Sequence, residues 1–248
     1  GAMIGQGWAV RTFLPGYPAV VQALEKPRTV LKEADFFGGP VKVLSGRAEG
    51  LDLLVFDAPH LFERDGSPYL DAGGADWPDN ALRFAAFSKM AARLAGGAIK
   101  GWRPDVVHGH DWQAGLVPLY LRDDANRPGT LLTIHNVAFH GLAPASAIAS
   151  LELDRADFTS DGFEFWNQIS ALKAGIVYSD KINTVSATYA RELLTPEFGM
   201  GMDGVLKTRA SDLTGILNGI DTDLWNPATD PAIQTYTTPR GKAKAKAA

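Results

Sequence analysis

The sequence contains no cysteine among its 248 residues, which excludes both a disulfide framework and a thiolate metal site. A chain without disulfides suits a reducing compartment, and we therefore expect a cytoplasmic location. No apolar run approaches the ~18 residues that span a bilayer. The amino-terminal residues also lack the charged and apolar regions of a signal peptide. We expect no membrane partner.

A stripe of lysine and arginine is also missing, apart from a short run at the extreme carboxyl terminus. The formal net charge is -4 and the isoelectric point is about 5.7, so nucleic acid is not an expected partner. The hydrophobic content of 46% and charged content of 21% are those of an ordinary globular chain that can bury a full core.

Strand-like and helix-like segments alternate along the chain, which predicts an α/β fold with a Rossmann-like, mostly parallel sheet flanked by helices. Strands are predicted at 9–14, 41–44, 51–56, 105–108, 130–135, 181–185 and 213–217, and helices at 18–25, 79–94, 112–121, 164–176 and 187–194. No repeat and no clear linker divides the chain.

The segment 103–112, with the sequence RPDVVHGHDW, is an apolar pair that leads directly into hydrogen-bonding side chains. Ligands of parallel sheets bind beyond the carboxyl ends of the strands, so His108, His110 and Asp111 are candidate site residues. We expect at most one of the two histidines to face the cleft while the other packs inward. Asp111 has an alternative role as the cap of the helix predicted at 112–121.

A second polar strand end follows about one βα unit later. The β-rich run 130–134 leads into His135 and Asn136, and the two strand ends are expected to share one cleft. Asn136 has an alternative role in capping the turn that follows it.

Further motifs carry a resemblance to a known family. These motifs are LPGYP (14–18), DAPHLF (57–62), GSPY (66–69), WRPDVVHGHDWQ (102–113), TIHN (133–136), LKAG (172–175), TVS (184–186) and LNGIDTDLWNP (217–227). In this order they resemble the bacterial glycogen synthases and the related starch synthases. The resemblance implies a retaining glucosyltransferase that moves glucose from ADP-glucose to the non-reducing end of an α-1,4-glucan in glycogen biosynthesis, with no cofactor.

The same resemblance implies a domain organisation. Members have the GT-B architecture, two Rossmann-like domains with the active site between them, and this chain matches the first, acceptor-side domain. We expect that domain at residues 4–227, because Gly1-Ala2-Met3 resembles the remnant of a cleaved tag, and a tail or connection at 228–248.

The chain departs from the family pattern at its start. Members open with a strand and a Lys-Thr-Gly-Gly-Leu loop that approaches the nucleotide sugar, and nothing before Trp8 matches it. We therefore expect the chain alone to be inactive. Without the family's first strand, a sheet position is left to fill, and we expect 9–14 or the amino terminus to make an intermolecular or swapped contact.

The transfer passes through an oxocarbenium-like state, so its site needs groups that hold sugar hydroxyls near the developing charge. His135 and Asp111 are the predicted catalytic residues: His135 binds a hydroxyl and presents its carbonyl, and Asp111 orients the acceptor. The predicted substrate-binding residues are Tyr69, His110, Asn136, Gln168, Lys173 and Asn218. For Tyr69 packing is an equal alternative, and for Lys173 and its polar neighbours a solvated helix face is the alternative.

Two other functions remain open at this level. His108, His110 and His135 have a spacing found in hydrolases that bind a divalent metal, with Asp111 or Glu164 as a further ligand. Alternatively, the chain is a glucan-binding module without turnover.

Overall fold

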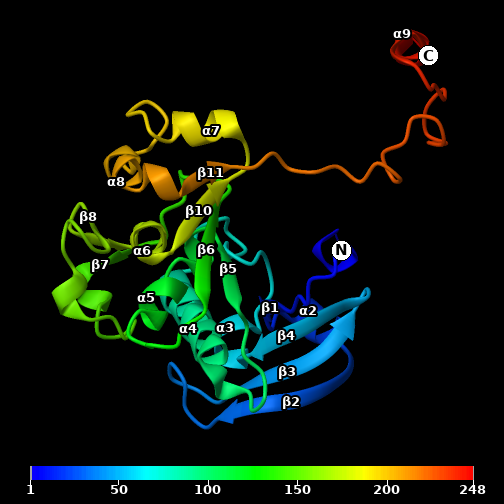
Figure 1. The fold of residues 1–248 in the computed structure, drawn as a ribbon. Helices are drawn as coiled ribbons and strands as arrows, with labels where there is room; N and C mark the ends of the chain where they lie inside the picture. The colour runs from blue at the N-terminus through cyan, green and yellow to red at the C-terminus, as the bar shows by residue number, and fades with distance from the viewer. Residues whose placement is uncertain (1, 248) are drawn as a thin grey trace.

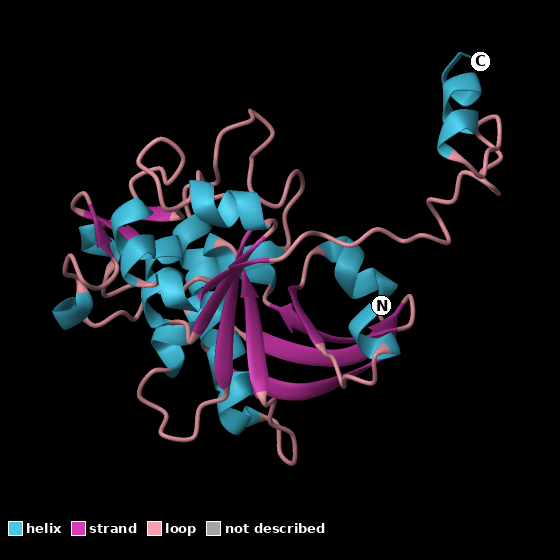
Figure 2. Ribbon diagram, turned by 45° about the horizontal axis from the view of Figure 1, so that its top comes forward, coloured by secondary structure: helices cyan, strands magenta, loops and turns pink. Residues whose placement is uncertain are grey.

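The computed structural model describes residues 2–247 and shows two four-stranded sheets, a small third sheet and the helices that cover them (Figures 1 and 2). The helices are α1 (Ala2–Gly5), α2 (Pro18–Ala23), α3 (Pro59–Phe62), α4 (Asn80–Arg93), α5 (Val117–Leu121), α6 (Ala171–Tyr178), α7 (Ala187–Glu192), α8 (Asp203–Thr208) and α9 (Pro239–Ala247). Short 3-10 turns lie at Trp112–Ala114, Ala145–Ala147, Arg155–Asp157 and Ala210–Asp212, and a π turn lies at Leu94–Ala98. Within residues 2–247, no helix is long and apolar enough to cross a membrane.

The first sheet has the order β1-β4-β3-β2, formed by β1 (Thr12–Pro15), β4 (Leu51–Asp57), β3 (Val41–Ala48) and β2 (Glu25–Glu33). β1 runs parallel to β4, whereas β2, β3 and β4 are antiparallel. The sequence analysis missed β2, because its residues are mostly exposed and polar and include Pro27. Such a composition is tolerated because β2 is an edge strand, where one side needs no hydrogen bonds.

The second sheet is entirely parallel and has the order β11-β10-β6-β5. Its strands are β5 (Val106–His110), β6 (Gly129–Ile134), β10 (Lys181–Thr184) and β11 (Leu213–Gly215), each overlapping a predicted strand. β1 and β5 are end strands of their two sheets, so each has one side without a ladder partner among residues 2–247. The sequence predicted that residues 9–14 or the amino terminus contact a second copy of the chain. That contact, which would involve β1, stays a prediction.

The third sheet corrects the prediction of one helix over 164–176. Here β7 (Leu142–Pro144), β9 (Gln168–Ser170) and β8 (Glu164–Phe165) form an antiparallel sheet, and only α6 is helical. Trp166 and Asn167 have φ values of 49° and 63°, which turn the chain back on itself and stop a right-handed helix. The Ser170 hydroxyl then accepts a hydrogen bond from the Lys173 amide at 3.1 Å and caps α6.

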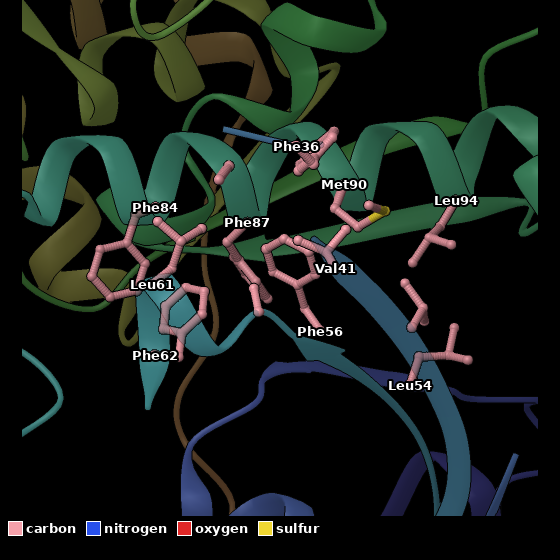
Figure 3. Close-up of a cluster of buried hydrophobic side chains, with 13 residues drawn as sticks. Phe36, Val41, Leu54, Phe56, Leu61, Phe62, Phe84, Phe87, Met90 and Leu94 are labelled. Carbon is pink, nitrogen blue, oxygen red and sulfur yellow. The ribbon is translucent and has the colours of Figure 1, made fainter. Parts of the chain in front are cut away.

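Helix α4 lies against both large sheets and organises the main core (Figure 3). Phe87 of α4 stacks on Phe13 of β1 with ring centroids 4.7 Å apart. Farther along the helix, Ala92 packs in a separate cluster with Val107 of β5 and with α5. One helix thereby fixes the mixed sheet relative to the parallel sheet, and both relative to the strand ends that follow.

The chain leaves this body after β11. It runs as an extended segment to α9, which lies apart from the sheets (Figure 1). Residues 228–247 of the predicted tail lie in this segment and in α9, and Gly1 and Ala248 lie outside the described residues.

Candidate active site

The carboxyl ends of β5 and β6 meet, as predicted, and bring four candidate residues together. The Asp111 amide donates to the Thr133 carbonyl at 2.9 Å, which continues the β5 to β6 ladder by one residue. His135 and Asn136 follow β6 directly and are both exposed. The cluster of His110, Asp111, His135 and Asn136 is called the strand-end cluster below.

The histidines form a row along this edge. The ring centroids of His108 and His110 are 4.4 Å apart, and those of His110 and His135 are 5.3 Å apart. The expectation that His108 and His110 face opposite ways was wrong, because residues two apart on a strand share a face.

His110 and His135 are joined directly, since His110 Nδ1 lies 3.1 Å from His135 Nε2. Such a bond needs a proton on one nitrogen and a lone pair on the other. Burial, followed by the neighbouring His135, lowers the pKa of His110. At pH 7 His110 is neutral, so the hydrogen bond between the two rings can form. This bond orients the His135 ring.

His108 belongs to a second chain of hydrogen bonds that runs across the sheet from β5 through β6 to β10. Its Nε2 lies 2.6 Å from Thr133 Oγ1, which donates to Asn183 Oδ1 at 2.5 Å. Because the hydroxyl proton is directed at Asn183, His108 Nε2 must be the donor to Thr133. Burial, with the charges of His110 and His135, lowers the pKa of His108 to about 4. His108 is therefore a neutral support for the row.

Asp111 supports the backbone of the next strand end. Its Oδ1 accepts hydrogen bonds from the amides of His135 at 2.7 Å and Asn136 at 3.4 Å. It makes no capping bond to the 3-10 turn that begins at Trp112, so the helix-cap alternative was wrong. The Asp111 backbone lies at φ 52° and ψ -163°, a region of backbone conformation that residues other than glycine rarely occupy. Asp111, although strained itself, thus fixes the backbone of His135, the other predicted catalytic residue.

Asn136 has the turn role that was its alternative. Its Oδ1 accepts a hydrogen bond from the Ala138 amide at 2.9 Å, which closes an Asx turn. The Nδ2 group is the part of this exposed side chain that remains for a ligand.

Tyr69 is linked through other rings to Trp112, the residue that follows Asp111 in the sequence. Its side chain is 42% exposed, and its ring lies 5.9 Å from Phe84, which in turn lies 4.9 Å from Trp112. The packing role that was the alternative for Tyr69 is therefore present, and the side chain is also partly open to a ligand.

The loop that carries Tyr69 is held by Arg83, which the sequence analysis missed. This fully buried arginine donates to the carbonyls of Leu61 at 2.7 Å and Pro68 at 3.1 Å. Asn80 adds a bond to the Tyr69 carbonyl at 2.9 Å. A charged residue on the apolar face of a helix, between Leu82 and Phe84, is the sequence signal that identifies such an anchor.

The other predicted residues lie outside the cluster. Lys173 is buried and donates to the carbonyls of Ser160 at 2.6 Å and Glu164 at 2.5 Å, and burial lowers its pKa. Gln168 is exposed on β9, and Asn218 is exposed three residues after β11. Within residues 2–247, no hydrogen bond joins Gln168, Lys173 or Asn218 to the strand-end cluster. Lys173 is neither on a solvated helix face nor paired with a carboxylate.

A metal centre has no geometric support. In the described part of the chain, no group of three His, Cys, Asp or Glu side chains is placed to hold a metal ion. The imidazoles of His108 and His110 instead bind Thr133 and His135. The described residues therefore do not support the alternative of a metal-dependent hydrolase, because the three histidines are not arranged as metal ligands.

Comparison with known proteins adds independent findings. Residues 1–208 match the family described as "Starch synthase catalytic domain". The chain is 54% identical over 248 residues to a glycogen synthase of Paracoccus denitrificans, covering 100% of the chain and 52% of that protein. It is 56% identical over 255 residues to a glycogen synthase of a Jannaschia species, with the same two coverages.

A solved structure shows the same fold. The catalytic domain of starch synthase IV from Arabidopsis thaliana, bound to ADP and acarbose, superposes with a TM-score of 0.79 at 30% identity. The superposition covers 96% of this chain and 50% of that one. The predicted fold class, half of a GT-B glycosyltransferase with a parallel sheet flanked by helices, is confirmed. The chain spans about half the length of the curated relatives that it matches.

Proposed function

The chain belongs to the starch synthase catalytic domain family, and we propose that it supplies the acceptor-side half of a glycogen synthase. In this proposal the whole protein transfers glucose from ADP-glucose to the non-reducing end of an α-1,4-glucan and retains the anomeric configuration. The nucleotide sugar is a substrate, and the reaction needs no cofactor. Residues 4–227 form the acceptor-side domain, and residues 228–248 lead toward the remainder of the protein.

The observation that carries the proposal is the fixed geometry of His135 at the carboxyl edge of the parallel sheet. Its amide is held by Asp111 and its ring by His110, while the residue itself is exposed. A positioned imidazole binds a glucosyl hydroxyl, and the His135 carbonyl at the strand end lies close to the developing positive charge. The strained Asp111 maintains this position.

The remaining predicted residues divide into two groups in this proposal. Asn136, through its Nδ2 group, and Tyr69 contact sugar hydroxyls or rings, and Gln168 and Asn218 line the path of the chain from their exposed positions. Lys173 is a positioning residue, because its ammonium group already binds two carbonyls of the 160–164 segment.

The test is a transfer assay on the full-length natural protein that contains this chain. With ADP-glucose and maltoheptaose, we expect ADP release and lengthening of the oligosaccharide. The substitution His135→Ala is expected to lower kcat at least about 100-fold, since one preorganised polar group contributes about 2.7 kcal/mol or more to such a transition state. The matched control is His60→Ala, because His60 binds the Phe36 carbonyl at 3.2 Å, away from the strand ends.

Transfer from UDP-glucose alone, or full activity in the His135 variant, would contradict this assignment. Calorimetric titration of the 248-residue chain with maltoheptaose separates the glucan-binding alternative. A full-length protein that binds maltoheptaose but transfers no glucose would be the module, and not the transferase.

We also infer that the open side of β1 mediates association with a second copy of the chain when only these residues are present. β1 is the end strand of its sheet, and unpaired strand edges template pairing with another chain. Light scattering over a roughly hundredfold range of protein concentration is expected to give the molar mass of a dimer, which falls toward that of a monomer on dilution. A monomer at every concentration would contradict the inference.

A further inference from the structure

The loop that carries His135 and Asn136 is held from two sides. On the β5 side, Asp111 accepts hydrogen bonds from the amides of both residues, as described above. On the β10 side, the Thr184 hydroxyl donates to the Ile134 carbonyl at 2.7 Å, directly before His135. Thr184 does not belong to the strand-end cluster, so the position of His135 depends on groups outside that cluster.

The second side of the loop is completed by Tyr189 of α7. Its hydroxyl oxygen accepts a hydrogen bond from the Val137 amide at 3.1 Å. Val137 is buried, and the partly buried Tyr189 ring packs against the same apolar cluster that contains Val137. Because a buried amide without an acceptor is costly, the Tyr189 hydroxyl stabilises the conformation that turns Val137 inward, two residues after His135.

Tyr189 is itself fixed by the start of its helix. Only two residues separate the end of β10 from α7, which lies beyond the carboxyl end of that strand (Figure 1). The Ser186 hydroxyl accepts a hydrogen bond from the Tyr189 amide at 2.9 Å and caps α7. Gly215 of β11 lies against this start, since a Cβ atom there would lie 2.2 Å from the Ser186 carbonyl oxygen. The position of Tyr189 therefore follows from the parallel pairing of β10 with β6 and β11.

We propose that Tyr189 is a positioning residue of the transferase and acts through the backbone of the loop 134–138. Asp111 binds the His135 amide and Tyr189 binds the Val137 amide, so the peptide groups on either side of the His135-Asn136 pair are fixed. Groups that stabilise a developing charge must be held within about 0.5 Å of their working geometry. This inference rests on the proposed function, because it names a further residue that maintains His135 in the site.

The test is the substitution Tyr189→Phe in the full-length natural protein, which removes the accepting oxygen and keeps the packed ring. We expect kcat to fall about tenfold, while the KM values for ADP-glucose and maltoheptaose change less than about twofold, because the bond positions groups that act in the transition state. The matched control is Tyr120→Phe, because the Tyr120 hydroxyl donates to the Leu151 carbonyl and not to the loop. An unchanged kcat in Tyr189→Phe, or an equal fall in both variants, would overturn the inference.

A double variant separates positioning from a general loss of stability. Asp111→Gly releases the same loop from its other side, so Tyr189→Phe has less geometry left to disturb. We expect Tyr189→Phe to lower the kcat of the Asp111→Gly variant less than about threefold. A further fall as large as that in the parent would mean that the two residues act independently, and it would overturn the inference.

Hydrogen–deuterium exchange of the same full-length proteins gives a readout that is independent of transfer. The segment 134–139 is expected to exchange at least about fivefold faster in Tyr189→Phe than in the parent, and at the parent rate in Tyr120→Phe. Unchanged exchange in Tyr189→Phe would show that the hydroxyl does not hold the loop. If the parent protein transfers no glucose, the proposed function fails, while the exchange difference still decides whether Tyr189 fixes this backbone.

Discussion

The two ends of the parallel sheet β11-β10-β6-β5 carry polar clusters of opposite character. At the amino end, Asp180 precedes β10 and accepts two bonds from Arg127, both at 2.7 Å, and two from Thr130, at 2.7 and 2.9 Å. At the carboxyl end, the strand-end cluster consists of the hydrogen-bonded pair His110 and His135, the strained Asp111 and Asn136, and every member except Asp111 is exposed. Polar side chains thus stabilise one end and remain partly open at the other.

The two ends differ in how completely their polar side chains are hydrogen-bonded within the protein. The bonds to Arg127 and Thr130 hold the pKa of Asp180 well below its usual range, because they stabilise the ionised carboxylate. At the carboxyl end, burial lowers the pKa values of His108 and His110, so these rings stay uncharged at neutral pH. Open ends of this kind are where parallel sheets bind ligands.

The largest expected effect breaks the amino end. Asp180→Ala leaves Arg127 and the Thr130 amide without their partner, and we expect the free energy of unfolding to fall by about 3 kcal/mol. Urea denaturation of the chain measures this change. The control is Asp203→Ala, which removes an exposed pair with Lys207 and is expected to cost less than about 0.5 kcal/mol. Equal losses in the two variants would show that the amino-end network adds no stability.

The opposite result is expected at the carboxyl end. Asp111→Gly relieves the strain at φ 52° but removes the acceptor of the His135 amide, so stability is expected to stay within about 1 kcal/mol of the parent. The kcat of the full-length protein is expected to fall about 100-fold, equal to about 2.7 kcal/mol of transition-state stabilisation.

Asp111→Asn keeps an oxygen that accepts from the same amides, and its kcat is expected to fall less than that of Asp111→Gly. A loss of stability in Asp111→Gly as large as that in Asp180→Ala would erase the contrast between the two ends.

Acidification is expected to affect the two ends in sequence. The folded-state pKa of His108 is about 4, below its unfolded value of roughly 6.5, so the unfolded chain binds more protons in that window and stability falls as the pH falls through it. Asp180 also has a lowered folded-state pKa, but its contribution is lost only below its unfolded value of roughly 3.9.

Urea denaturation at a series of pH values from 7 to 4 tests this order. His108→Gln keeps a donor for Thr133 without an ionisable ring, and it is expected to reduce the loss of stability on acidification. A parent protein whose stability stays constant from pH 7 to pH 4 would contradict the assignment of a neutral, partly buried His108.

The carboxyl-end cluster was predictable because its signal is local. In both strands an apolar run stops at polar residues, and the parallel pairing of β5 with β6 brings Asp111 to His135. The amino-end network has no such signal, since Asp180 and Thr130 are separated by 50 residues and meet only through the pairing of β6 with β10. Residue type alone does not reveal a bond of that kind.

The predicted helix over 164–176 failed for a different physical reason. Apolar residues at 165, 166, 169 and 172 fit a helical period, but the backbone has positive φ values at Trp166 and Asn167, and a bulky residue such as Trp166 does not favour this conformation. The solvated helix face that was the alternative for Lys173 was wrong as well, because the Lys173 ammonium group binds carbonyls of the 160–164 segment. A local conformation opposed to propensity is invisible to pattern analysis.

The smallest expected effect concerns Asn136, where support and ligand binding meet in one side chain. Asn136→Ala removes the Asx-turn bond to the Ala138 amide and is expected to cost about 0.5 to 1 kcal/mol of stability. Asn136→Asp retains the accepting oxygen, so its stability is expected to equal that of the parent, while loss of the Nδ2 donor raises the KM for maltoheptaose. If Asn136→Asp matches the parent in both stability and KM, the residue only closes the turn, and the open character of the carboxyl end then depends on His135 rather than on the whole strand end.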